Sequence, residues 1–408
     1  MQARTRAFSL SWLTYASYYL GRKGFSVVKA TLARELGLST GALAWIDTAY
    51  LVAYAAGQLP SGIATDRWGS RRVLALGLVV SALACACFGA ASSAAVFAGC
   101  FALNGLAQAT GWPGTTKVVA DWTAKHERGR IMGLWSTCYQ VGGIAATALA
   151  SWLLMQHGWR AVFHGPALCL LAIAALVWFG LPRSTAPTVT SAASAGEATL
   201  QTSAAAESHE QLRALLRTPI VYGYGACYFC IKLIRYSLLF WLPFYLHTSA
   251  GFAEAESGYL STGFEIGGVA GSILLGRLSD RWPHARAAVA AVSLLGLAGA
   301  LWLYASVPLS SALWHFTSLA LVGALLFGPD ALVSGAAAQD AGGPRAAASA
   351  TGLVNGLGSA GALLQGALTV GVQQAFGWQA LFFVFVGLSL LSAACLVPGL
   401  RARTRAGL

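Results

Sequence analysis

Apolar runs long enough to cross a bilayer recur from Phe8 to Pro398, and they constrain the fold of this chain more than any other feature. Hydrophobic residues make up 57% of the 408 positions and charged residues 10%, a balance that a soluble globular protein cannot present to water. A spanning helix needs roughly 20 apolar residues, and we count about twelve such runs. They begin near Phe8, Leu43, Val73, Ala94, Ile131, Ala161, Pro219, Ser257, Ala287, Ala312, Ala348 and Ala380. We therefore predict an all-α membrane protein with twelve transmembrane helices.

Positive charge alternates from loop to loop along the chain. A net charge of +12 would suggest nucleic acid in a soluble protein, but here the basic residues follow the positive-inside rule. The basic loops contain Arg4, Arg6, Arg67, Arg71, Arg72, Lys125, Arg128, Arg130, Arg183, Arg213, Arg217, Arg277, Arg281, Arg286, Arg345, Arg401, Arg403 and Arg405. The opposite loops hold little beyond Lys29, Arg34 and Arg160. We therefore expect both termini and the central loop in the cytoplasm, and no nucleic-acid partner.

A polar segment divides the chain near its middle. From about Leu181 to Thr218 the sequence is rich in Ser, Thr, Ala, Pro and Glu, and it is long enough to link two bundles. We predict an N-terminal six-helix bundle at 1–182, a cytoplasmic linker at 183–217 and a C-terminal six-helix bundle at 218–408.

A loop motif occurs once in each half. The pattern G-x-x-x-D-R-W stands at 62–68 and again at 276–282, an offset of 214 positions (280 minus 66). The motif resembles the loop signature of the major facilitator superfamily, which implies two pseudo-symmetric bundles. We interpret its charges as a contact that breaks when the halves rock; the alternative is that they only anchor a cytoplasmic loop. The residues concerned are Asp66, Arg67, Arg71, Asp280 and Arg281.

Four cations lie inside predicted spans, where charge is costly. Arg22 and Lys23 belong to the first span, and Lys232 and Arg235 belong to the seventh. Because the first apolar run carries these two charges and lacks a small-residue cleavage site, we expect it to be the first helix and not a cleaved signal peptide. Arg22 and Arg235 are 213 positions apart (235 minus 22), so the repeat predicts matching depths on opposite sides of a central cavity. The planar guanidinium groups of two arginines can bind a phosphate through paired, charge-assisted hydrogen bonds. Lys232 shares the helix face of Arg235 and either joins the site or pairs elsewhere, whereas Lys23 points about 100° away from Arg22.

Further motifs narrow the resemblance to the organophosphate:phosphate antiporter family. They are Tyr18-Tyr19-Leu20-Gly21-Arg22-Lys23, Asn104-Gly105-Leu106-Ala107-Gln108, Gly111-Trp112-Pro113, Glu127-Arg128-Gly129 and Phe264-Glu265-Ile266-Gly267-Gly268. The resemblance implies exchange of a phosphate ester for inorganic phosphate by alternating access, with Arg22 and Arg235 holding the phosphoryl group. Because two arginines without an anion repel each other, we expect the empty carrier to reorient poorly.

Three positions depart from the family pattern. Gln58 stands where many members have a lysine, Tyr139 where the glycerol-3-phosphate transporters have a histidine, and Phe240 where several members have a carboxylate. Lys23 then has Glu265 as its expected partner, and Lys232 is a candidate for the positive charge absent at position 58. These departures leave the organic half of the substrate open.

Aromatic and acidic residues complete the candidate site. Tyr18, Trp112, Tyr139 and Gln58 are candidates for lining the cavity. Asp330 has no obvious cation; it either couples protons or caps a helix broken at Pro329, and we favour the cap. Asp47 lies near the start of the second span, where a helix N-terminus tolerates an anion.

The sequence contains no zinc-ligand set, Walker lysine motif or nucleophile elbow, so we expect neither an enzyme nor a cofactor. We expect a functional monomer in the inner (plasma) membrane, surrounded by lipid and carrying a small phosphate-containing anion. Two alternatives stay open, a membrane sensor of sugar phosphate and a carrier of another organic anion.

Overall fold

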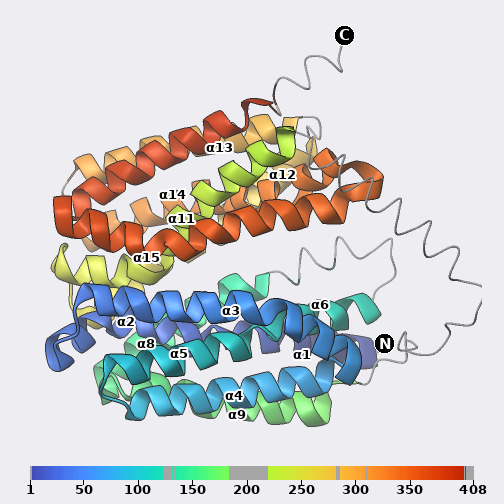
Figure 1. Ribbon diagram of the computed structural model, residues 1–408. Helices are drawn as coiled ribbons and strands as arrows, with labels where there is room; N and C mark the ends of the chain where they lie inside the picture. The colour runs from blue at the N-terminus through green and yellow to red at the C-terminus, as the bar shows by residue number, and fades with distance from the viewer. Residues whose placement is uncertain are drawn as a thin grey trace, which may run out of the picture. The chain divides into compact units, whose positions relative to one another are not determined.

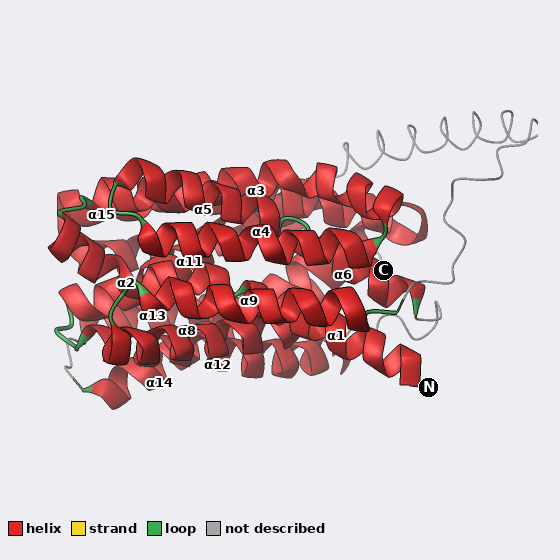
Figure 2. Ribbon diagram, turned by 90° about the horizontal axis from the view of Figure 1, so that it is seen from below, coloured by secondary structure: helices red, strands yellow, loops and turns green. Residues whose placement is uncertain are grey.

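The structure is a computed structural model that describes residues 2–122, 131, 135, 137–182, 219–281, 285–307, 311–398 and 400. All secondary-structure elements in these ranges are helices (Figure 2). The predicted linker at 183–217 and the Glu127-Arg128-Gly129 motif lie outside the described residues.

Contacts divide the chain into two compact units, Met1–Thr188 with Leu239–Glu265, and Val189–Leu238 with Ile266–Leu408. The end of one helix and the start of the next, around residues 239–265, therefore group with the N-terminal part of the chain. The domain boundaries at 182 and 218 stay predictions.

The described residues up to 182 form helices that belong to the first unit (Figure 1). They are α1 Gln2–Tyr18, α2 Leu20–Leu36, α3 Thr40–Trp68, α4 Ser70–Ala90, α5 Ala94–Gln108, α6 Gly111–Asp121, α8 Thr137–His157 and α9 Ala161–Gly180. The first predicted span corresponds to α1 and α2 together, which are interrupted at Tyr19, and the fourth corresponds to α5 and α6. Helix α3 lies along α5, and α4 lies along α9.

The remaining helices are α11 Pro219–Thr248, α12 Glu254–Arg281, α13 Arg286–Ser306, α14 Ala312–Ala331, the short π-helix η2 Leu332–Ala336 and α15 Ala337–Cys395. Helix α15 covers two predicted spans. Gly377 within it has a φ of 83°, a left-handed backbone that glycine adopts without steric cost. Figure 1 shows the chain reversing direction between the orange and red arms of α15, as two separate spans require.

Eight helical stretches of the described chain are long and apolar enough to cross a membrane. The first span is not among them because α1 and α2 are each only 17 residues long. The all-α fold predicted from the sequence is thus confirmed, whereas the count of twelve spans stays a prediction.

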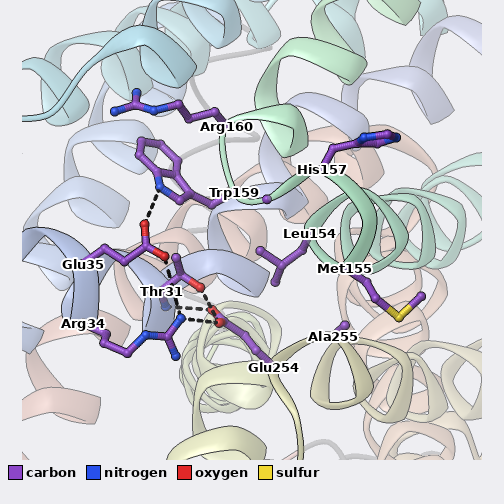
Figure 3. A pocket seen from close by; sticks show the side chains of 11 residues that line it. Thr31, Arg34, Glu35, Leu154, Met155, His157, Trp159, Arg160, Glu254 and Ala255 are labelled. Carbon is purple, nitrogen blue, oxygen red and sulfur yellow. Dashed lines mark hydrogen bonds and ion pairs between the residues drawn. The ribbon is translucent and has the colours of Figure 1, made fainter.

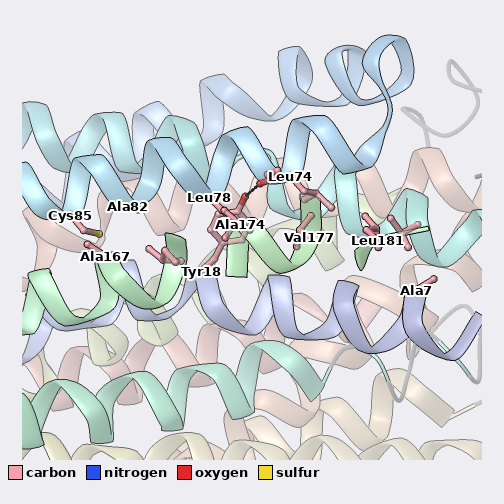
Figure 4. Close-up of a cluster of buried hydrophobic side chains, with 13 residues drawn as sticks. Ala7, Tyr18, Leu74, Leu78, Ala82, Cys85, Ala167, Ala174, Val177 and Leu181 are labelled. Atoms are coloured by element: carbon pink, nitrogen blue, oxygen red, sulfur yellow. Dashed lines mark hydrogen bonds between the residues drawn. The ribbon is translucent and has the colours of Figure 1, made fainter. Parts of the chain in front are cut away.

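Close packing holds the helices together in both units. In the first unit, Leu74, Leu78 and Ala174 join α4 to α9 in a buried apolar cluster (Figure 4). In the second unit, a Cβ added at Gly267 or Gly271 of α12 would lie about 2 Å from backbone oxygens of α14. This G-x-x-x-G spacing allows two helix backbones to approach closely, which matters in lipid because apolar burial alone does not drive helix association there.

Candidate anion-binding site

Arg22 lies near the start of α2 and is only 8% exposed. Its guanidinium carbon lies 4.4 Å from the ring centroid of Tyr19, 5.6 Å from that of Tyr54 and 5.8 Å from that of Tyr50. Its Nε donates a hydrogen bond of 2.9 Å to Oε1 of Gln108 on α5. Electron-rich rings and an amide oxygen therefore stabilise the buried cation without neutralising it.

Gln108 is itself held by a buried polar network. Its Oε1 also accepts a hydrogen bond of 3.0 Å from the Tyr50 hydroxyl, and its Nε2 donates to Asn104 Oδ1 at 3.0 Å. Asn104 Nδ2 in turn donates to the backbone oxygen of Gly21 at 2.7 Å. Because each amide is fixed by more than one partner, the network presets the position of the Arg22 head group.

No carboxylate of the described chain forms an ion pair with Arg22, and its Nη2 atom is buried without a hydrogen-bond acceptor. A buried guanidinium with an unused donor is costly unless an acceptor joins it. An anion with several oxygens meets this need, since guanidinium groups bind carboxylate and phosphate oxygens through paired, charge-assisted hydrogen bonds.

Arg235 lies on α11 in the second unit and differs from Arg22 in one important respect. Its Nη1 atom forms an ion pair of 2.9 Å with Asp330 Oδ2, and its guanidinium lies 4.5 Å from the Phe327 ring centroid. The interpretation of Asp330 as a helix cap without a cation is therefore wrong. Helix α14 continues through Pro329 and Asp330 to Ala331, and the carboxylate points to a helix that sequence spacing alone could not identify.

Lys232 lies one turn before Arg235 on α11. Its Nζ donates a hydrogen bond of 3.2 Å to Ser359 Oγ on α15 and lies 4.9 Å from the Tyr228 ring centroid. The structure thus brings Lys232 to a hydroxyl and an aromatic face.

Lys23 and Glu265 form a buried ion pair of 3.0 Å, with side chains 7% and 5% exposed. Gly143 on α8 makes room for it, because a Cβ there would lie 2.3 Å from Glu265 Oε1. The two residues that we paired from the sequence are therefore adjacent, and a gating role for them stays a prediction.

A second buried pair corrects two expectations. Lys29 was assigned to a loop and Asp47 to a helix N-terminus, but Lys29 lies inside α2 and Asp47 lies two turns into α3. Lys29 Nζ and Asp47 Oδ2 are 2.5 Å apart, and both side chains are 0% exposed. The Trp241 ring centroid lies 3.7 Å from the same Nζ. Lys29 is therefore a cation that pairs within the helical part of the structure, and it does not indicate on which side of the membrane a loop lies.

The aromatic candidates occupy different environments. Tyr18 is fully buried in the apolar cluster of Figure 4, and its hydroxyl is bonded to Thr110 at 2.8 Å. Trp112 is 39% exposed and packs edge-on against Tyr15 at 5.5 Å. Tyr139 packs, partly buried, at the edge of a second cluster around Tyr15. Tyr18 therefore serves packing in this structure more than it contacts Arg22. The residues around the Arg22 guanidinium, which we call the Arg22 cradle, are Tyr19, Tyr50, Tyr54 and Gln108.

Gln58, Tyr54 and Tyr50 are spaced by four residues on α3, so they share one helix face. Tyr50 and Tyr54 were missed from the sequence, and the i, i+4, i+8 spacing with Gln58 was the signal that could have found them. Gln108 was quoted only as part of a motif, although it is the residue that contacts Arg22.

The predicted loop contacts are only partly described. The side chains of Asp66 and Asp280 lie outside the described set. Arg67 and Arg281 are exposed, and the Arg71 guanidinium lies 5.7 Å from the Trp178 ring centroid.

A surface pocket lies at the other end of α2 from Arg22 (Figure 3). Arg34, Glu35, Trp159 and Glu254 line it, and Trp159 Nε1 donates a hydrogen bond of 3.0 Å to Glu35 Oε2. None of the predicted substrate residues lines this pocket. No group of three or more metal-ligating side chains occurs within the described residues either.

Comparison with known proteins identifies the family. The family model described as Major Facilitator Superfamily matches residues 11–366. The chain belongs to the major facilitator superfamily. Two solved structures of a bacterial homologue of the human lysosomal transporter Spinster share this fold, although their identities are only 17% and 15%. Their TM-scores are 0.70 and 0.72, and they cover 98% of this chain and 96% and 97% of their own.

Curated relatives of this superfamily member are named as exchangers and transporters. A sugar phosphate exchanger 3 from Bos taurus is 31% identical and covers 93% of this chain and 89% of its own. A putative glycerol-3-phosphate transporter 2 from Arabidopsis thaliana is 32% identical, covering 99% and 88%. A glucose-6-phosphate exchanger from Mus musculus is 30% identical, covering 95% and 90%. The family recognised from the sequence motifs is thus confirmed.

Proposed function

We propose that this superfamily member is a multi-pass membrane carrier that exchanges a phosphorylated organic metabolite for inorganic phosphate by alternating access. The observation that carries the proposal is the Arg22 cradle, a preset buried guanidinium whose Nη2 has no acceptor and which has no carboxylate partner among the described residues. The names of the relatives support the substrate class, since they are sugar phosphate and glucose-6-phosphate exchangers and a putative glycerol-3-phosphate transporter.

Arg22 and Arg235 are the proposed ligands of the phosphoryl group. Each is a planar fork that bonds two phosphate oxygens at once, which a lysine cannot reproduce. Their separation of 213 positions, close to the repeat offset, supports a paired role (235 minus 22). Lys232, one turn from Arg235, supplies a third positive charge to the substrate.

Obligatory exchange follows mainly from Arg22. The sequence led us to expect that Arg22 and Arg235 both lack an anionic partner and repel each other. The structure revises this expectation for Arg235, because Asp330 already neutralises its charge. Arg22 keeps an uncompensated charge until an anion arrives, so the empty carrier would have to reorient with a buried, unpaired cation. Bound phosphate removes this penalty and permits rocking of the helical bundles.

The finer assignments belong to the same proposal. Lys23 with Glu265, and the loop charges Asp66, Arg67, Arg71, Asp280 and Arg281, make and break contacts during rocking. We propose a functional monomer in the inner membrane, with both termini in the cytoplasm as the positive-inside rule predicts.

Uptake of radiolabelled phosphate into phosphate-loaded proteoliposomes tests the proposal. Wild type should take up label, and Arg22→Lys and Arg235→Lys should each lose at least about tenfold in uptake because bidentate binding is lost. Arg34→Lys is the matched control, since Arg34 is 62% exposed at the far end of α2. Full uptake by Arg22→Lys would contradict the assignment of the phosphoryl group.

A further inference from the structure

We propose that Asp330 determines substrate specificity by accepting a hydrogen bond from the organic part of the substrate, so that the carrier prefers phosphate esters with hydroxyl groups near the phosphoryl group. The inference rests on the proposed exchange function, in which Arg235, the partner of Asp330, binds the phosphoryl group.

Only one of the two Asp330 carboxylate oxygens accepts a hydrogen bond from the described residues. Oδ2 accepts from Arg235 at 2.9 Å, whereas Oδ1 is buried and accepts no hydrogen bond from any described residue. The residue as a whole is 6% exposed. A carboxylate has about four acceptor positions, and leaving a buried oxygen without a donor is costly. This oxygen therefore calls for a donor that the described residues do not supply.

The backbone around Asp330 gives an independent indication of function. Pro329 precedes it, and the π-helix η2 begins at Leu332, two residues later. The Ser334 hydroxyl donates a hydrogen bond of 2.6 Å to the Asp330 backbone oxygen across this segment. Single-turn π-helices are rare and occur frequently at functional sites. The π-helix thus begins directly after the last turn of α14, which carries Asp330.

The charges around Asp330 disfavour inorganic phosphate that has no organic group attached. Lys232 and Arg235 contribute two positive charges and Asp330 one negative charge, so their sum is +1. A carboxylate beside the binding arginine repels phosphate oxygens, and a site for inorganic phosphate alone would be better without it. A hydroxylated ester satisfies all these groups, because its phosphoryl oxygens accept from the cations and its hydroxyl donates to Oδ1. Among the described residues, Arg22 has no such carboxylate beside it.

Competition between two esters tests the inference. Labelled phosphate uptake into phosphate-loaded proteoliposomes is inhibited with glycerol 3-phosphate or with n-propyl phosphate, which has the same carbon number and phosphoryl group but no hydroxyl. In wild type we expect glycerol 3-phosphate to inhibit at a concentration about tenfold or more below that of n-propyl phosphate, the factor typical of one hydrogen bond to a charged group.

Asp330→Asn should bring this ratio close to one. Its amide oxygen can still accept from Arg235, but the amide nitrogen then replaces Oδ1 and donates where an acceptor is needed. Glu256→Gln, the same type of change at an exposed acid in the first turn of α12, should leave the ratio unchanged.

Equal inhibition by the two esters in wild type would overturn the inference even if the variant failed to fold. An unchanged ratio in a transporting Asp330→Asn would overturn it as well. Failure of the underlying function looks different, since wild type would then take up no labelled phosphate at all.

Discussion

Replacing Asp47 with alanine would leave Lys29 as a fully buried cation without its carboxylate. The two side chains are 0% exposed and their charged atoms are 2.5 Å apart, so water cannot take the place of the missing partner. Removing one member of such a pair costs about 3 to 5 kcal/mol of folding free energy. The Trp241 ring, whose centroid lies 3.7 Å from Lys29 Nζ, remains in the variant and retains up to about 2 kcal/mol of attraction. We therefore expect a loss near the lower end, about 3 kcal/mol.

A thiol-reactive dye provides the assay in detergent-purified protein, because unfolding exposes buried cysteines. Cys85, Cys138, Cys227 and Cys230 are buried and free. Asp47→Ala should lower the midpoint of thermal unfolding clearly, and Lys29→Met combined with Asp47→Leu should restore most of it, because no unpaired charge then remains. Arg34→Ala is the control, since the Arg34–Glu35 pair is 3.8 Å long, 62% and 49% exposed, and worth about 0 to 1 kcal/mol. The reasoning is refuted if Asp47→Ala unfolds at the same temperature as Arg34→Ala.

Two further predictions concern α5. Gln108→Leu should raise the KM for phosphate exchange about tenfold, because Arg22 Nε and the Tyr50 hydroxyl lose their acceptor. The concentration dependence of uptake measures the KM, and an unchanged KM would show that the network does not set the Arg22 position. Gly105→Ala should destabilise the fold by about 1 to 3 kcal/mol, because the added Cβ would lie 2.3 Å from the Tyr50 backbone oxygen. Gly99→Ala on the same helix meets nothing within 4 Å and should be neutral or stabilising in the dye assay; equal effects of the two changes would contradict the packing.

Much of the fold could be predicted because hydrophobic run length is a local property of the sequence. Helices α4, α9, α11, α13 and α14 begin within three residues of the predicted positions. The interruption at Tyr19 was not predicted, because its backbone remains nearly helical and no proline lies near the break.

Partners across helices were harder to predict. Lys23 and Glu265 were paired correctly because Phe240 replaces a carboxylate of the family pattern, which left Glu265 as the expected partner. Asp330 was not paired with Arg235, 95 positions away, because residue spacing gives the face of one helix but not which helix lies opposite. Lys29 was misplaced for a related reason, since a lysine late in an apolar run is readily assigned to a loop when its buried partner is unknown.

Coupled efflux tests the account most directly. Proteoliposomes are loaded with radiolabelled phosphate and diluted into buffer with or without an external sugar phosphate. If Arg22 needs an anion before the carrier can reorient, label should leave slowly into plain buffer and rapidly when sugar phosphate is added, and Arg22→Lys should abolish the acceleration. Equal efflux with and without external sugar phosphate would contradict exchange, and no efflux under either condition would favour a sensor that binds without transport.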